Sequence, residues 1–200
     1  DIENHRSLWK REDVGTVGFE MMEAQGLLWL GSNSDWVAYD QGTGAEQARI
    51  PIGGKVGGPV VRTGTVAVLP VRPNTVIAVD LVDKKVLWRL RRPTPDGLTV
   101  RGQAGATVDE KNNRVYAAFS DGVVMAVRPD TGAEIWTAAL GKPAELFADV
   151  DTTPLVMPDG TLWVASYNKG LFVLDPNTGA RLVERPQTRL VGLSRADNVV

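Results

Sequence analysis

Residues 125–136 read MAVRPDTGAEIW, and three other stretches of the chain repeat the same pattern. These are VAYDQGTGAE from residue 37, IAVDLVDKKVLW from residue 77 and FVLDPNTGARLV from residue 172. Each stretch begins as an apolar strand, passes through a polar turn and continues as a second strand. One slot of the pattern recurs at spacings of 40, 48 and 47 residues, and it is filled by Asp40, Asp80, Arg128 and Asp175. A period of this length indicates the four-stranded blades of a β-propeller.

The third repeat shows how one blade is expected to fold. AGATVDE, RVYAAF, VVMAVR and AEIWTAAL are four strand-like segments, and the turns between them contain NN, SDG and DTG. Glycine in such a turn supplies the positive φ that a tight hairpin needs, and Asp or Asn bonds nearby backbone amides. The sequence therefore predicts an all-β fold built from antiparallel sheets of four strands.

The repeat divides the chain into predicted blades at residues 13–52, 53–92, 93–141 and 142–187, with partial blades at 1–12 and 188–200. We expect residues 1–200 to form a single propeller domain or a piece of one. A propeller removes its open sheet edges by closing a ring of about four to eight blades. Either further blades close the ring, or two copies close it as a homodimer. We favour the first, because the sequence stops at NVV, inside an expected strand.

Three tryptophans, Trp9, Trp88 and Trp136, recur where the outermost strand of a blade is expected. A large ring at this position can pack one blade against the next. We therefore predict a structural role for all three.

Composition limits the functions that the chain can have. The net charge is −2, which offers no basic field for nucleic acid, and there is no cysteine for a disulfide, a thiolate metal site or a nucleophile. His5 is the only histidine, so a histidine-based triad or metal site cannot be built. No apolar run approaches the ~18 residues that span a bilayer.

The stretch FADVDTTP at residues 147–154 places Asp149 and Asp151 between strand-like segments. Asp-x-Asp-x-Thr also matches the nucleophile motif of haloacid-dehalogenase phosphatases, but that motif needs a following helix and distant Lys and acidic groups around Mg²⁺. Here Pro154 and further strands follow. A calcium-binding EF-hand fails as well, because no third acid and no bidentate Glu stand at its spacing.

The Asp-Thr-Gly-x-x-x-Trp pattern resembles the quinoprotein-like (PQQ-type) propeller repeat. LTVRGQAGATV at residues 98–108 and the segment at 147–179 further resemble the BamB family of outer-membrane barrel-assembly lipoproteins. This resemblance implies a parent ring of eight blades. It also implies a non-catalytic scaffold without cofactor or metal. The scaffold would lie in the periplasm, peripheral to the outer membrane and held by a lipid anchor outside this chain.

The resemblance also implies a partner and a site. Leu98, Val100 and Arg101 in one loop, with Asp149 and Asp151 in another, match positions that dock on a periplasmic POTRA domain of BamA. Val100 departs from the usual leucine, at a cost of about 1 kcal/mol for a lost methylene. As an alternative of equal weight, Arg101 contacts the carboxylates of Asp149 and Asp151 within the same molecule. Such a contact is compatible with docking. Open blade edges could also pair with unfolded outer-membrane protein substrates.

The enzymatic alternative is a PQQ-dependent dehydrogenase, which shares the repeat, and a further alternative is another PQQ-repeat binding protein. Such dehydrogenases hold Ca²⁺ and the quinone with Asp, Glu and Asn ligands, and many have a cysteine pair. The sequence assembles no such set. Residues 83–92, DKKVLWRLRR, concentrate five basic residues around an outer strand, where basic edges deter aggregation; a site for an acidic partner is an open alternative.

Overall fold

The computed structural model describes residues 7–19, 21–94, 104–141, 150, 152–186, 189–190 and 192–194. All regular secondary structure in this part of the chain is β-strand, which confirms the all-β prediction. The first two sheets contain β1 (Met22–Ala24), β2 (Leu27–Ser32), β3 (Asp35–Asp40), β4 (Glu46–Pro51), β5 (Val61–Thr63), β6 (Val66–Val71), β7 (Thr75–Asp80) and β8 (Lys85–Arg91). The last two contain β9 (Ala106–Asp109), β10 (Arg114–Ala118), β11 (Val123–Val127), β12 (Glu134–Ala139), β13 (Leu155–Val156), β14 (Leu162–Ser166), β15 (Gly170–Leu174) and β16 (Arg181–Arg185).

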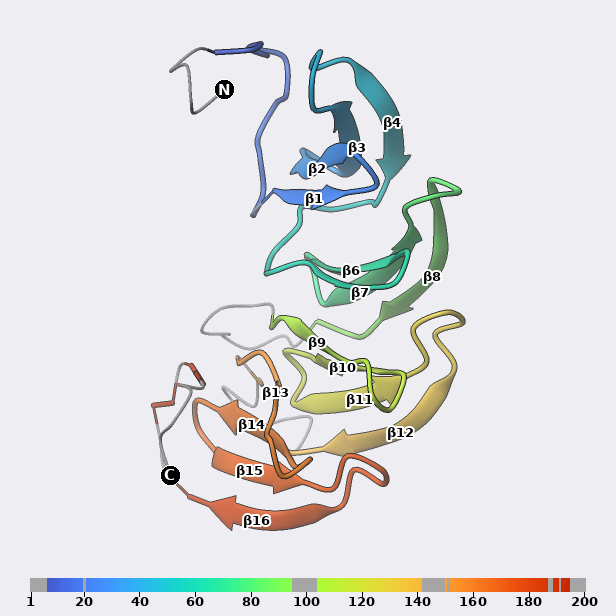
Figure 1. Cartoon of the computed structure of the whole chain (residues 1–200). Coiled ribbons are helices and arrows are strands. Elements are labelled where there is room, and N and C mark those ends of the chain that lie inside the picture. Colours follow the sequence, from blue (N-terminus) through green and yellow to red (C-terminus); the bar gives the residue numbers. More distant parts are fainter. Residues whose placement is uncertain are drawn as a thin grey trace.

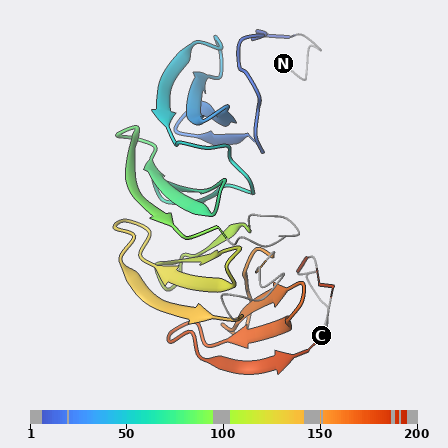
Figure 2. The same ribbon diagram turned by 180° about the vertical axis from the view of Figure 1, so that it is seen from behind.

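Each of the four sheets is an antiparallel meander whose strands follow chain order, from β1-β2-β3-β4 to β13-β14-β15-β16. The sheets succeed one another around an arc, and the fourth strands β4, β8, β12 and β16 lie on its convex side (Figure 1). The same arc is seen from behind in Figure 2. These sheets are propeller blades, as the repeat predicts.

The hydrophobic core lies between neighbouring sheets. Val76 and Ile77 are adjacent on β7 but belong to different buried clusters, and so do Tyr116 and Ala117 on β10. Successive side chains of a strand point to opposite faces, so each inner strand packs against the sheet before it and the sheet after it. β11 is accordingly buried along its whole length, whereas β16 is exposed along its whole length.

Tryptophans join successive units, which confirms their predicted structural role. Each ring lies on the glycine of the Thr-Gly turn in the next unit, so close that a Cβ on that glycine would come within 2.5–2.7 Å of the ring. The pairs are Trp9 with Gly44, Trp88 with Gly132 and Trp136 with Gly179. Each indole N–H also donates to a carbonyl of the same turn, at 2.7, 2.7 and 2.8 Å for Gln41, Pro129 and Pro176. The turn glycine is therefore needed for contact as well as for its positive φ.

The contact between the first two sheets is made differently. Ala48 occupies on β4 the register position that tryptophan holds on β8 and β12, and Lys84, with a φ of 54°, replaces the turn glycine. Arg89 spans the two sheets instead, donating to the carbonyls of Pro51 at 2.7 Å and Ile52 at 2.8 Å. The missing ring and the missing glycine thus occur together at one interface.

The aspartate of the repeat stabilises its own turn. Oδ1 of Asp40 accepts hydrogen bonds from the backbone N–H of Gly42 at 3.1 Å and from the N–H and hydroxyl of Thr43, both at 2.8 Å. These bonds lower the pKa of Asp40, the Thr43 hydroxyl contributing most. Asp80 and Asp175 also accept backbone N–H bonds in their turns. The aspartate that recurs in the repeat therefore has a local structural role.

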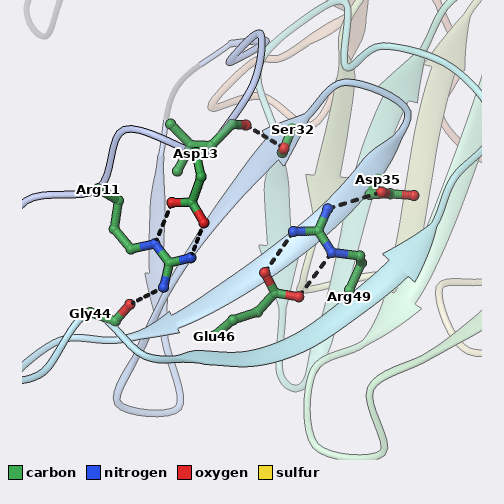
Figure 3. Close-up of polar contacts among 8 residues, drawn as sticks. Arg11, Asp13, Ser32, Asp35, Gly44, Glu46 and Arg49 are labelled. Atoms are coloured by element: carbon green, nitrogen blue, oxygen red, sulfur yellow. Dashed lines mark hydrogen bonds and ion pairs between the residues drawn. The ribbon is translucent and has the colours of Figure 1, made fainter.

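The segment before β1 packs on the first sheet. Arg11 donates to Asp13 and to the carbonyl of Gly44 (Figure 3). Its guanidinium carbon lies 5.2 Å from the centre of the Tyr39 ring. The residues before Glu12 were expected to form the outer strand of a preceding blade, and the described residues among them, 7–11, form no strand. Trp9 nevertheless makes the contact expected of an outer-strand tryptophan.

Candidate interaction surface

All five residues predicted to dock a partner lie outside the residues that the structure describes; they are Leu98, Val100, Arg101, Asp149 and Asp151. We call residues 95–103 the first loop and residues 142–151 the second loop, of which Val150 alone is described. The described residues on either side are the stems of these loops. The stems show where each loop leaves its sheet and what holds it there.

Both loops leave from the same end of the blades. The first loop joins β8 to β9 and the second joins β12 to β13, so each connects the fourth strand of one sheet to the first strand of the next. In an antiparallel meander these connections share one end with the hairpins between the second and third strands, while the Thr-Gly turns lie at the other. We call these the loop end and the turn end; they can be followed from the strand directions in Figure 1.

The stems that follow the two loops are in direct contact. A Cβ on Gly105 would lie 2.2 Å from Oγ1 and 3.1 Å from Cγ2 of Thr153, so only glycine allows the two chains to approach this closely. Two residues further on, the Thr107 hydroxyl donates to the carbonyl of Pro154. Two segments that are 48 residues apart in sequence, at residues 105 and 153, therefore lie side by side.

Thr152, beside the predicted aspartates, is a structural residue. Its side chain is 2% exposed, and its hydroxyl donates to the carbonyl of Ala165 at 2.9 Å and accepts from the N–H of the same residue at 2.9 Å. It thus completes the backbone hydrogen bonds of β14 where a strand neighbour is missing. The threonines of the DTTP motif therefore fix the end of the second loop.

Asn74 holds the start of the first loop. It is fully buried, with a φ of 42°, and its side-chain amide donates to the carbonyl of Pro93 at 2.7 Å and accepts from the N–H of Ser120 at 2.9 Å. Its own carbonyl accepts from the N–H of Arg92 at 3.0 Å. One buried side chain thus joins the hairpin after β6, the stem after β8 and the hairpin after β10.

The β10–β11 hairpin, residues 119–122, contacts the stems of both loops; we call it the bridging hairpin. On the side of the first loop, Arg92 Nε donates to Asp121 Oδ2 at 2.6 Å. On the side of the second loop, the N–H of Leu140 donates to the carbonyl of Gly122 at 2.8 Å. The N–H of Val150 donates to the carbonyl of Phe119 at 3.4 Å. The described residues beside both loops are therefore bonded to one common element.

The bridging hairpin also carries two unpaired polar atoms. Asp121 Oδ1 and Ser120 Oγ are buried and have no hydrogen-bond partner among the described residues. The Arg92 and Asp121 side chains are 30% and 15% exposed, so their ion pair is partly shielded from water. A carboxylate oxygen and a hydroxyl at this place can accept or donate hydrogen bonds.

Other shifted pKa values have structural causes. Arg49 pairs with Glu46 at 2.6 Å and with Asp35 at 3.0 Å, and its hydrogen bond lowers the pKa of Glu46 (Figure 3). Burial, together with the nearby carboxylate of Asp109, raises the pKa of Tyr116 to about 12. Ion pairing and burial within the blades account for both groups.

A metal-binding site needs a cluster of side chains that can act as ligands. No group of three or more His, Cys, Asp or Glu side chains within the described ranges could hold a metal ion. His5 lies outside those ranges. None of the described residues belongs to a helix of the length and apolarity needed to cross a membrane.

Two residues that organise this surface, Asn74 and Gly105, were not predicted from the sequence. Asn74 stands in RPNT, which is typical of any surface turn, and nothing local indicates that its amide would be buried. Gly105 precedes a strand. A glycine at such a place indicates close approach of another backbone, and this signal could have predicted the contact at Gly105. The partner of that approach, Thr153, is set only by the stacking of the blades.

Comparison with known proteins identifies relatives of the chain. The profile of a family described as outer membrane protein assembly factor BamB matches residues 1–200. The BamB of Nitrosomonas eutropha is 22% identical over 195 residues, which are 94% of this chain and 46% of that protein. The crystal structure of BamB from Moraxella catarrhalis superposes with a TM-score of 0.70 at 25% identity, covering 90% of this chain and 54% of that one. The chain therefore spans about half the length of the BamB relatives that it matches.

A quinohemoprotein alcohol dehydrogenase from Comamonas testosteroni has the same fold. It superposes with a TM-score of 0.70 at 15% identity, over 93% of this chain and 39% of the dehydrogenase. An identity this low indicates shared architecture alone, since unrelated functions use the same propeller.

Proposed function

Because the chain belongs to the family of outer membrane protein assembly factor BamB, we propose that it is a non-catalytic docking scaffold of outer-membrane β-barrel assembly. Its partner is a POTRA domain in the periplasmic region of BamA. The protein then acts in the periplasm beside the outer membrane, to which a lipid anchor outside this chain holds it.

We place the docking surface on the first and second loops. Leu98, Val100 and Arg101 offer two apolar side chains around a guanidinium, and Asp149 and Asp151 offer two carboxylates. A charged group that is surrounded by apolar contacts and shielded from water is typical of the residues that dominate interface energy. The two loops together would present both charge signs to one partner domain.

The contact between Gly105 and Thr153 carries this proposal. It places the stems after the two loops within van der Waals distance, and residues 98–101 and 149–151 stand a few residues before these stems in the sequence. Asn74 and the bridging hairpin hold the preceding stems. A surface whose supports are fixed before binding loses less conformational entropy when the partner docks.

A quinone-dependent dehydrogenase is the alternative. Its cofactor site requires Ca²⁺ ligands from carboxylates and amides around the propeller axis, and the described residues contain no group of acidic side chains of that kind. The donor set in this part of the chain does not fit the cofactor. We therefore propose no quinone-dependent step.

Binding to the periplasmic region of BamA tests the proposal. Isothermal titration calorimetry would compare the wild-type protein with Arg101→Ala and Asp149→Ala, and with Lys85→Ala as a control whose exposed side chain pairs with Asp83 on the turn side of β8. We expect each loop variant to raise the Kd at least about tenfold, which corresponds to the ~1.4 kcal/mol of one charge-assisted contact, and the control to leave it unchanged.

Unchanged binding in both loop variants would reject the site. Circular dichroism spectra that match the wild type would show that the variants are folded, so that a loss of binding can be assigned to the loops.

A further inference from the structure

A cavity of about 260 Å³ opens between the first two sheets at the loop end. Its charged side chains are Arg72 from the β6–β7 hairpin and Arg89 and Arg91 from β8, and no acidic residue lines it. Ile52, Val71 and Pro73 form an apolar wall beside these arginines. We call this cavity the arginine pocket.

The three guanidinium groups have no carboxylate partner among the described residues. Arg89 is bonded to the carbonyls of Pro51 and Ile52, which orient its side chain and leave its charge unneutralised. Arg72 and Arg91 form no ion pair within the described part of the chain. Arg49, on β4 of the first sheet, instead bonds two carboxylates.

The position of these arginines follows from register. Arg89 and Arg91 are two residues apart on β8 and therefore point to the same face of the sheet, while Trp88 points to the other. Thr75, the partner of Arg91 in the ladder, begins β7 directly after the hairpin that contains Arg72. Sheet geometry thus brings three positive charges to one cavity in a chain whose net charge is −2.

We propose that the arginine pocket binds a small oxyanion, a phosphate or a carboxylate group. Guanidinium groups bind both through paired N–H bonds, and the apolar wall weakens the screening of their charges by water. Arg89 is held in place before any ligand arrives, which lowers the entropic cost of binding. The cavity is slightly smaller than the ~300–1,000 Å³ of sites for drug-sized ligands, so it suits a single anionic group.

The residues that line the pocket are not part of the first or the second loop, and the pocket is not explained by propeller architecture. Packing of the first sheet on the second needs Arg89, through its bonds to Pro51 and Ile52. It does not need Arg72 or Arg91, whose side chains form no hydrogen bond or ion pair with the described residues. These two residues can therefore be changed with little expected effect on folding.

Titration of the purified protein with inorganic phosphate at low ionic strength tests the proposal. Phosphorus NMR line broadening and calorimetry would follow wild type, Arg72→Gln and Arg91→Gln, with Arg62→Gln as a control of equal charge change. Arg62 lies on β5, outside the pocket, and donates to the carbonyl of Gly64. We expect saturable binding that weakens at least about tenfold in each pocket variant and less than about twofold in the control.

A second titration, with a short capped peptide rich in glutamate, distinguishes the source of the anion. Tighter binding of phosphate would assign the pocket to a phosphate group, and tighter binding of the peptide would assign it to an acidic side chain of a protein partner. The proposal is overturned if neither probe saturates, or if Arg62→Gln loses as much affinity as the pocket variants. Thermal melting of each variant would confirm that it remains folded.

Discussion

Replacing Trp136 by alanine should remove the main contact between the third and fourth blades. The side chain is 6% exposed, lies on Gly179 and stacks against Tyr116 with ring centres 5.9 Å apart. A buried tryptophan removes about 200 Å² of side-chain surface from water, worth about 5 kcal/mol at 25 cal/mol per Å². Measured Trp→Ala losses in cores of about 3–5 kcal/mol agree with this value.

The lost hydrogen bond should add little to this cost. The carbonyl of Pro176 accepts from Trp136 at 2.8 Å, but Arg114 also donates to it, so the oxygen keeps a partner in the variant. We therefore expect a loss of about 4 kcal/mol in the free energy of unfolding. With a urea m-value of about 2.5 kcal/mol/M, the midpoint would fall by about 1.6 M.

Urea unfolding followed by far-ultraviolet circular dichroism would measure this shift. Trp163→Ala is the matched control, because Trp163 is only partly buried and its indole donates within its own blade to Thr161 at 3.0 Å. Trp163→Ala should lower the free energy of unfolding by less than half as much as Trp136→Ala. A loss below about 1 kcal/mol for Trp136→Ala, or equal losses for both variants, would refute the proposed role of the ring in joining blades.

Three further predictions concern other contacts. The double variant Ala48→Trp/Lys84→Gly should restore the ring and glycine contact between the first two blades, and its stability should exceed the sum of the single changes by about 0.5–3 kcal/mol in denaturant unfolding. Asn74→Ala should lower the free energy of unfolding by about 1–3 kcal/mol, because the buried N–H of Ser120 loses its acceptor and the carbonyl of the exposed Pro93 loses a donor, and it should also weaken binding to the BamA periplasmic region. The pKa of Asp40 is lowered in the folded state, so its contribution to stability is present above the ordinary value of 3.8 and is lost as pH falls through the folded-state pKa. The stability difference between wild type and Asp40→Ala should therefore narrow as the pH is lowered below that value.

Each of these predictions has a contrary outcome. Additive effects of the two changes at Ala48 and Lys84 would show that the ring and glycine do not act as a pair. Asn74→Asp keeps the acceptor for Ser120 but loses the donor to Pro93, so it should fall between wild type and alanine; a variant as stable as wild type would contradict the role of the donor. A stability difference between wild type and Asp40→Ala that stays constant from pH 6 to pH 3 would contradict the assigned hydrogen bonds of Asp40.

The blades could be predicted from sequence because their determinants are local. A turn aspartate, a glycine and a tryptophan recur at fixed offsets, and each acts within its own hairpin or on the next unit. Strand alternation then sets which side chains are buried. The order and type of the strands in the third blade follow directly from these patterns.

The supports of the candidate surface could not be predicted in the same way. Asn74, Ser120 and Pro93 come from separate turns, and only the stacking of two blades brings them together. The contact between Gly105 and Thr153 likewise depends on how one blade stacks on the next, which the repeat pattern does not specify. The predicted docking residues 98–101, 149 and 151 lie outside the described part of the chain, so their roles remain predictions.

Hydrogen–deuterium exchange of the protein, alone and with the BamA periplasmic region, tests most directly whether the two loops form one docking surface. We expect slower exchange in residues 95–103 and 142–151 and in the bridging hairpin, with no change in the turns at residues 40–44, 128–132 and 175–179. Protection at those turns, or in only one of the two loops, would contradict a single surface at the loop end.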